Sequence, residues 1–99
     1  MPRPRVCRRI GHRFDIAYFK PAGVPVSSLE EVVLSVDEAE ALRLADLNGM
    51  PQEECASKMG VSQPTFHRIV TSARKKVADA VTNGKALKVE GGEYRMLRK

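Results

Sequence analysis

In the middle of the chain, apolar positions recur at the spacing of a helix. Ala39, Leu42 and Ala45 lie three residues apart and share one helical face. Ser35 and Glu38 precede them with the spacing of a capping box, in which a hydroxyl and a carboxylate satisfy the first backbone amides. Asn48-Gly49 supplies a left-handed stop. The pattern predicts a helix over about 37–48.

Two more helices are predicted on either side of Gly60. Pro51 and the acids that follow it suit the first turn of a helix over 52–59. Ser62 is typical of an N-cap for a longer helix that begins at Gln63 and closes at Asn83-Gly84. Its expected buried stripe consists of Phe66, Ile69, Val70, Ala73, Val77 and Ala80.

The two ends of the chain are predicted less sharply. Residues 1–13 indicate an extended arm, 14–19 a short strand, and 20–25 a turn-rich linker, while 29–34 fit either a helical turn or a strand. Residues 86–97 alternate around Gly91-Gly92 and predict a β-hairpin. A lone hairpin is barely stable, so this one must pack on the 14–19 segment or on another subunit. We therefore expect a mainly α fold: an arm and linker (1–34), a three-helix core (35–84) and a hairpin tail (85–99).

The segment from residue 52 to residue 71 has the spacing of a helix-turn-helix. Two helices that cross steeply need a small residue at the crossing, and Ala56 meets that need. They also need a left-handed turn four residues later, which Gly60 supplies. Beyond the turn they need apolar residues that pack between the helices, and Val61, Phe66 and Ile69 fit this role. The alternative is an ordinary helical hairpin with a glycine turn.

The helical period also predicts which side chains face DNA. With the apolar stripe turned inward, the N-terminal part of the second helix would meet base edges in the major groove. Gln63 suits the edge of adenine and Arg68 that of guanine. The expected base contacts are Gln63, Pro64, His67, Arg68 and Thr71, and the expected backbone contacts are Ser62, Ser72, Arg74, Lys75 and Lys76. For each residue the alternative is a solvated surface side chain.

The basic start of the chain supports the same interpretation. Arg3 and Arg5, followed by Arg8 and Arg9, resemble arms that enter a minor groove beside a helix-turn-helix, and we expect them to contact the DNA backbone. A disordered basic terminus is the alternative.

Charge is segregated along the 99 residues. Residues 1–20 carry six basic side chains and one acidic one. Residues 35–60 carry two basic and six acidic side chains, and residues 61–99 carry nine basic and three acidic ones. A polyanion would be attracted to both ends. No apolar run approaches the roughly 18 residues that cross a membrane, and the start lacks the apolar stretch of a secretory signal. We expect a cytoplasmic protein with no membrane partner.

Catalysis and metal binding have little support in the sequence. His12 and His67 have no acid or nucleophile in a recognisable arrangement. Cys7, His12 and Cys55 are too few and too irregularly spaced for a structural zinc site, and Cys55 is expected as a small core residue. Gly91-Gly92 lacks the helix and lysine of a phosphate-binding loop. We expect no enzyme, no metal and no cofactor.

Several stretches resemble known families. Residues 34–49, 52–54, 59–62 and 73–77 look like the region-four helix-turn-helix of bacterial sigma factors. The whole chain resembles a small uncharacterised prokaryotic family of predicted DNA-binding proteins, through its Met-Pro-Arg-Pro-Arg start and residues 18–23, 77–80 and 83–87. The resemblance implies DNA binding and transcriptional regulation. Pro51 departs from the usual serine cap, and Gln63 and His67 replace a basic and a very small residue, so the target sequence does not carry over.

Two functions follow as hypotheses. The first is a regulator that binds double-stranded DNA sequence-specifically as a homodimer, with half-sites about 34 Å apart and the tail as the dimer element. The second is an adaptor that docks on RNA polymerase or another regulator through the acids Asp37, Glu40 and Asp46. RNA binding remains open because structured RNA also attracts basic faces.

Overall fold

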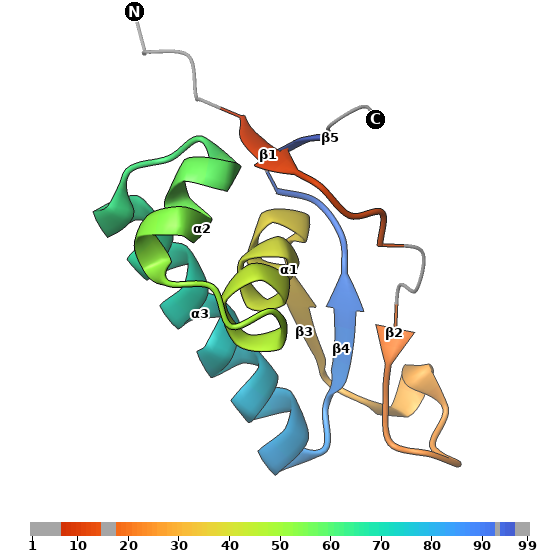
Figure 1. The fold of residues 1–99 in the computed structure, drawn as a ribbon. Coiled ribbons are helices and arrows are strands. Elements are labelled where there is room, and N and C mark those ends of the chain that lie inside the picture. The colour runs from red at the N-terminus through yellow and green to blue at the C-terminus, as the bar shows by residue number, and fades with distance from the viewer. Residues whose placement is uncertain (1–6, 15–17, 93, 97–99) are drawn as a thin grey trace, which may run out of the picture.

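In the computed structural model, which describes residues 7–14, 18–92 and 94–96, three helices pack with two small sheets (Figure 1). The helices come from the middle of the chain, and the strands come from both ends. The fold is thus more mixed than the expected mainly α domain with a single hairpin.

Helix α1 (Val36–Leu42) begins at the predicted capping box. The Ser35 hydroxyl accepts from the Glu38 backbone amide, and the Glu38 side chain accepts from the Ser35 amide. The chain then continues as a π-helical segment, η2 (Arg43–Leu47). The stretch expected as one helix is therefore a short α-helix that widens in its second half.

Helices α2 (Gln52–Met59) and α3 (Gln63–Asn83) have the expected bounds and are joined by a tight turn at Gly60. Gly60 has a φ of 68°, a left-handed conformation that glycine adopts without the steric cost of a Cβ. The Ser62 hydroxyl caps α3 by accepting from the Thr65 amide, and Gly84 ends the helix in the left-handed conformation. Local capping and turn chemistry thus determine both ends of the longest element.

The C-terminal hairpin is not formed, and that prediction was wrong. The strands are β1 (Arg8–Ile10), β2 (Tyr18–Phe19), β3 (Glu31–Leu34), β4 (Ala86–Val89) and β5 (Tyr94–Met96). Strand β4 lies between β2, with which it is antiparallel, and β3, with which it is parallel, whereas β5 pairs in parallel with β1. The pairing of β4 with β2 matches one of the two partners expected for the tail.

The remaining predictions for the ends have separate outcomes. Residues 29–34 end in strand β3, after a short 3-10 turn, η1 (Val26–Ser28). In the segment expected as a strand over 14–19, residues 15–17 lie outside the described part, and β2 accounts for the last two residues.

Gly91-Gly92, which we expected to form the hairpin turn, instead crosses the N-terminus of α1. The Val36 amide donates to the Gly91 carbonyl at 2.9 Å. A Cβ on Gly92 would collide with the Asp37 carboxylate and the Ser35 side chain. The close approach takes the chain from one sheet to the other, so β4 and β5 cannot pair with each other.

The core has two apolar clusters, and strands from both ends of the chain contribute to them. The first contains Ile10, Val36, Ala41, Leu44, Cys55, Ala56, Met59, Phe66, Ile69 and Val70, and the second contains Leu34, Ala39, Ala73, Ala80 and Leu87. Burial raises the pKa of the Cys55 thiol, consistent with a core residue. No described helix is long and apolar enough to cross a membrane.

Candidate nucleic-acid interface

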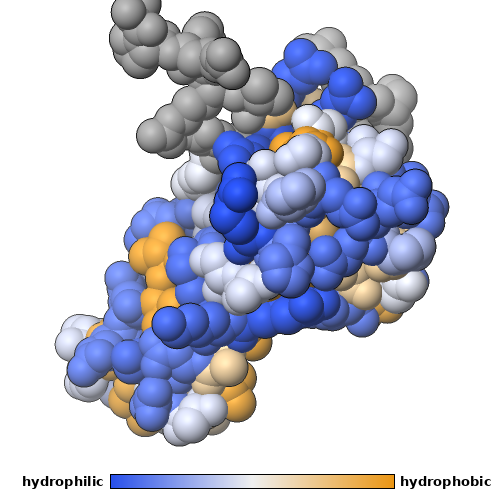
Figure 2. Space-filling model, turned by 90° about the vertical axis from the view of Figure 1, so that its left-hand side faces the viewer, coloured by the Kyte–Doolittle hydropathy of each residue, from blue (hydrophilic) through white to orange (hydrophobic). Residues whose placement is uncertain are grey.

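The first half of α3 has one buried face and one exposed face. Phe66, Ile69, Val70 and Ala73 are buried, as the helical period predicts. Exposed side chains on the other side are Gln63, Pro64, His67, Arg68 and Thr71. Figure 2 looks at this side of the molecule, where α2 and the start of α3 lie, and shows hydrophilic residues over most of it. A polar and cationic helix face is therefore open to a partner.

The contact between α2 and α3 brings together the residues expected at the elbow. Ala56 is 4% exposed in α2, and Phe66 is fully buried in α3. Val61 is half-buried and packs on the same cluster as Ile69. With the left-handed Gly60 between them, these residues hold the start of α3 against α2 while its outer face remains clear.

Hydrogen bonds along the first turn orient Arg68. The Ser62 hydroxyl donates to Thr65 Oγ1 at 2.9 Å, and Arg68 Nη2 donates to the same Thr65 oxygen at 3.1 Å. On the neighbouring side, His67 Nδ1 lies 3.4 Å from Gln52 Oε1 of α2. The guanidinium of Arg68 has no carboxylate partner in the described part of the chain, so its charge is available to an anion or a base edge.

The cationic and hydroxyl residues further along α3 differ in their partners. Arg74 forms a bidentate ion pair with Asp46, at 2.7 and 3.0 Å, and this pair lowers the pKa of the Asp46 carboxyl. Lys76 donates to the Glu38 carboxylate at 2.7 Å, and Ser72 donates to it at 2.5 Å. Lys75 is exposed and forms no ion pair among the described residues.

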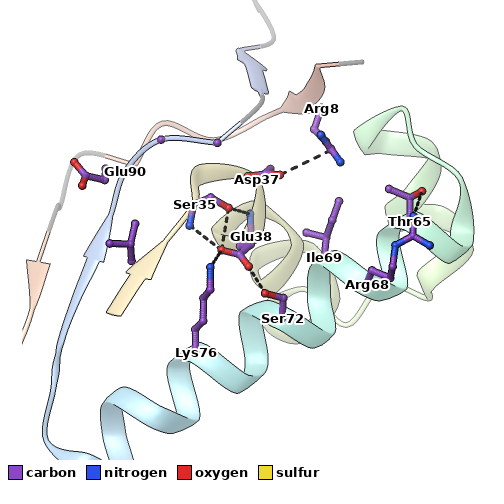
Figure 3. A pocket seen from close by; sticks show the side chains of 13 residues that line it. Arg8, Ser35, Asp37, Glu38, Thr65, Arg68, Ile69, Ser72, Lys76 and Glu90 are labelled. Atoms are coloured by element: carbon purple, nitrogen blue, oxygen red, sulfur yellow. Dashed lines mark hydrogen bonds and ion pairs between the residues drawn. The ribbon is translucent and has the colours of Figure 1, made fainter. Parts of the chain in front are cut away.

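A groove of about 710 Å³ runs beside α3 and separates it from β1 and from Gly91-Gly92 (Figure 3). Thr65 and Arg68 lie at one end of it, and Ser72 and Lys76 converge on Glu38 further along. Its lining carries the cations Arg8, Arg68 and Lys76 and the acids Asp37, Glu38 and Glu90. The groove is therefore polar with balanced charge.

Part of the basic arm lies next to the elbow. The Arg9 side chain passes over Gly60, since a Cβ there would lie 3.1 Å from Arg9 Nε. Arg8 lines the groove, with Nε 3.8 Å from the Asp37 carboxylate. Arg3 and Arg5 lie outside the described residues.

Three acids of α1 are buried, including Asp37 and Glu40, which the adaptor hypothesis placed on a docking face. Asp37, Glu38 and Glu40 are 8%, 6% and 2% exposed. Glu40 accepts from the Gly11 amide at 2.8 Å and from Arg43 at 2.6 and 2.8 Å. Asp46 remains exposed but is paired with Arg74. The acidic face that motivated an adaptor on the transcription machinery is therefore occupied by internal contacts.

Sequence reasoning treated Glu38 as a capping residue and missed its contacts with α3. Burial acts to raise the pKa of its carboxyl, but hydrogen bonds from Lys76, Ser72 and Ser35 outweigh it, so the pKa lies below its ordinary value. Lys76 and Ser72 come 38 and 34 residues later in the chain. The only available hint was their spacing of one helical turn, which places both on one face of α3.

Among the residues that the structure describes, no three His, Cys, Asp or Glu side chains are grouped to hold an ion. Cys7 is exposed and Cys55 is buried, and both are free thiols.

The fold and the exposed helix face define a small mixed domain of three helices with small sheets. A family described as "Protein of unknown function DUF134" matches residues 1–97, and the chain belongs to this family. A UPF0251 protein of Moorella thermoacetica is 60% identical over 97 residues, which are 98% of this chain and 65% of that protein. A UPF0251 protein of Thermoanaerobacter sp. strain X514 is 59% identical over 96 residues, which are 97% of this chain and 85% of that protein. No solved structure matches the chain.

Proposed function

We propose that this domain binds double-stranded DNA sequence-specifically as a helix-turn-helix module and regulates transcription, with the start of α3 in the major groove. One observation carries the proposal. Gln63, His67, Arg68 and Thr71 are exposed together on the first turns of a helix that follows a tight glycine elbow. In helix-turn-helix docking, these are the positions that meet base edges.

The chemistry of the exposed side chains suits this role. An amide such as that of Gln63 pairs with the N6 and N7 edge of adenine, and the fork of Arg68 pairs with O6 and N7 of guanine. Pro64 and Thr71 offer apolar and hydroxyl contacts beside them. Because Thr65 already orients Arg68, less conformational freedom is lost when the guanidinium binds.

The proposed backbone contacts come from the N-terminus and the middle of α3. Within the described part of the chain, Lys75 is exposed and forms no ion pair, and Arg74 is held by a surface pair whose side chains are 47% and 43% exposed. Such pairs contribute about 0–1 kcal/mol, so Arg74 can exchange Asp46 for a phosphate at small cost. Ser62 lies at the helix N-terminus, where backbone amides favour anions.

The path of β1 supports a contribution from the arm. The Arg9 side chain lies over the elbow, so β1 runs beside the turn that precedes α3. Figure 1 shows β1 beside the top of α2, next to the turn that leads to α3. Within the proposal, residues Arg3 and Arg5 would reach the minor groove next to the base-reading helix, as arms of this kind do.

Homodimer formation is part of the proposal, because one short reading helix covers too few bases for a regulator. A two-fold pair would read half-sites about 34–36 Å apart. A selected DNA site with inverted repeats at that spacing would support a dimer, whereas a single asymmetric half-site would oppose it.

Selection of bound sequences from a random duplex pool tests the function directly. Arg68→Ala should weaken binding to the selected site by about 1–3 kcal/mol and relax one base position. Lys75→Ala should weaken all sequences alike and reduce the salt slope of log K by about 0.9, the value for one lost phosphate contact. Lys20→Ala removes a charge next to β2, away from α3, and serves as the control. If the wild-type protein retained no duplex DNA at low salt, the proposed function would be wrong.

A further inference from the structure

The two flanks of α3 differ in what their cations already contact. Ser72 and Lys76 lie one helical turn apart and face the groove, where both donate to Glu38 (Figure 3). Thr71 and Lys75 are each one residue earlier, rotated by about 100° around the helix, and are exposed. Each flank therefore carries one hydroxyl side chain and one lysine, but among the described residues only the groove-side pair is bound to a carboxylate.

Glu38 is the centre of the groove-side contacts. Its Oε1 accepts from the Ser35 amide, the Ser35 hydroxyl and Lys76, and its Oε2 accepts from Ser72. The side chain is 8% exposed. One buried carboxylate thus joins the cap of α1 to two positions on α3.

A phosphate in the groove would gain little. Away from Arg68, which lies at one end, the lining carries two cations, Arg8 and Lys76, and three acids, so a polyanion meets no excess of positive charge there. If Lys76 moved to a phosphate, Glu38 would stay buried without its cation, which is costly. The exposed flank has no comparable penalty, because among the described residues Lys75 forms no ion pair and has only a Coulombic attraction to Asp79.

We propose that Glu38 is a positioning residue, and that Ser72 and Lys76 hold α3 in place rather than contact the DNA backbone. DNA then lies against the flank of Thr71 and Lys75, and the part of the groove around Glu38, Ser72 and Lys76 stays outside the protein–DNA contact. This inference rests on the proposed function, and it revises the sequence-based expectation that Ser72 and Lys76 bind phosphates.

Salt dependence of DNA binding separates a phosphate contact from a positioning role, because each released counterion contributes to the slope of log K against log salt. Lys75→Met and Lys76→Met are matched variants that remove one charge and keep the length of the side chain. We expect Lys75→Met to reduce the slope by about 0.9. Lys76→Met should lower the affinity about five-fold at every salt concentration, which corresponds to about 1 kcal/mol. It should leave the slope unchanged. A reduction of the slope by Lys76→Met equal to that of Lys75→Met would overturn the proposal.

A second experiment does not depend on DNA. Glu38→Gln and Glu40→Gln each neutralise a buried carboxylate of α1. The hydrogen-bond partners given for Glu40 are Gly11 and Arg43, and neither lies in α3. Residual dipolar couplings of backbone amides should show a changed angle between α1 and α3 in Glu38→Gln and an unchanged angle in Glu40→Gln. An unchanged angle in both variants would overturn the positioning role. Failure of the wild-type protein to bind duplex DNA would contradict the proposed function alone.

Discussion

At the scale of single residues, the buried acids of α1 are the least expected feature. Asp37, Glu38 and Glu40 lie within one short helix, yet each faces a different part of the molecule. Asp37 approaches Arg8 of β1, Glu38 binds α3, and Glu40 binds Gly11 and Arg43. Replacing a buried ion pair by apolar groups is often neutral or stabilising, so such pairs are better evidence for defined orientation than for stability. Here they orient the two neighbours of α1.

Stability should depend on the ionisation of Glu38. Its folded pKa lies below the ordinary value of 4.5, so the unfolded chain binds the proton more readily and the folded state loses stability as pH falls below about 4.5. Glu38→Gln should cost about 1.5–3 kcal/mol at pH 7, the range for hydrogen bonds to a charged group. In the variant, the free energy of unfolding measured with urea should also decrease less between pH 6 and pH 3 than in the wild-type protein. An acid dependence in the variant as steep as in the wild-type protein would contradict the role given to this carboxylate.

At the scale of elements, capping and turn residues made the helices predictable. The bounds of α2 and α3 follow from Pro51, Gly60, Ser62 and Gly84, which act within a few residues of themselves. The strands were not predictable in the same way. The alternation in residues 86–89 and 94–96 is compatible with a hairpin or with two separate sheets, and only the partners, β2, β3 and β1, decide between them. Those partners lie at the other end of the chain.

The elbow itself can be tested by comparing two glycines with nearly equal backbone angles. Gly60 has φ 68° and ψ 34°, and Gly84 has φ 66° and ψ 39°. Gly84→Ala should cost about 1–2 kcal/mol, the penalty for a left-handed alanine. Gly60→Ala should cost more in urea unfolding, because its Cβ also displaces Arg9, whereas nothing lies within 4 Å of a Cβ on Gly84.

Arg9→Ala provides the control for that comparison. In the Arg9→Ala background, the cost of Gly60→Ala should fall toward that of Gly84→Ala, since the three atoms nearest to a Cβ on Gly60 all belong to the Arg9 side chain. An excess that persisted without Arg9 would show that the extra cost does not come from the contact of Arg9 with the elbow.

At the scale of the whole molecule, strands from the two ends of the chain pair with each other beside the helices. Strand β4 is the central strand of one sheet, and β5 pairs with β1 in the other. Ile10 of β1 is fully buried in the same cluster as Met59 and Phe66. This explains how far sequence reasoning reached for the candidate site. The exposed residues of α3 follow from helical period alone, whereas the contacts of Ser72, Lys76 and Arg9 depend on segments 30 or more residues away.

The dependence of β1 on the C-terminal strand leads to a prediction about the whole chain. A chain that ends at Gly92 keeps the Gly91 carbonyl but lacks β5, the strand partner of β1 in the described structure, and should lose about 2–3 kcal/mol as Ile10 becomes exposed. Ile10→Ala in the complete chain should cost about 2–5 kcal/mol through the lost burial and the cavity left behind. If β5 stabilises the molecule mainly by holding Ile10 in the core, the truncation and the substitution remove the same contact. Their combined cost in urea unfolding should then fall short of the sum by about 1 kcal/mol or more. Strictly additive costs would mean that the two ends stabilise the helices independently, and that the arm beside the elbow needs no partner strand to stay there.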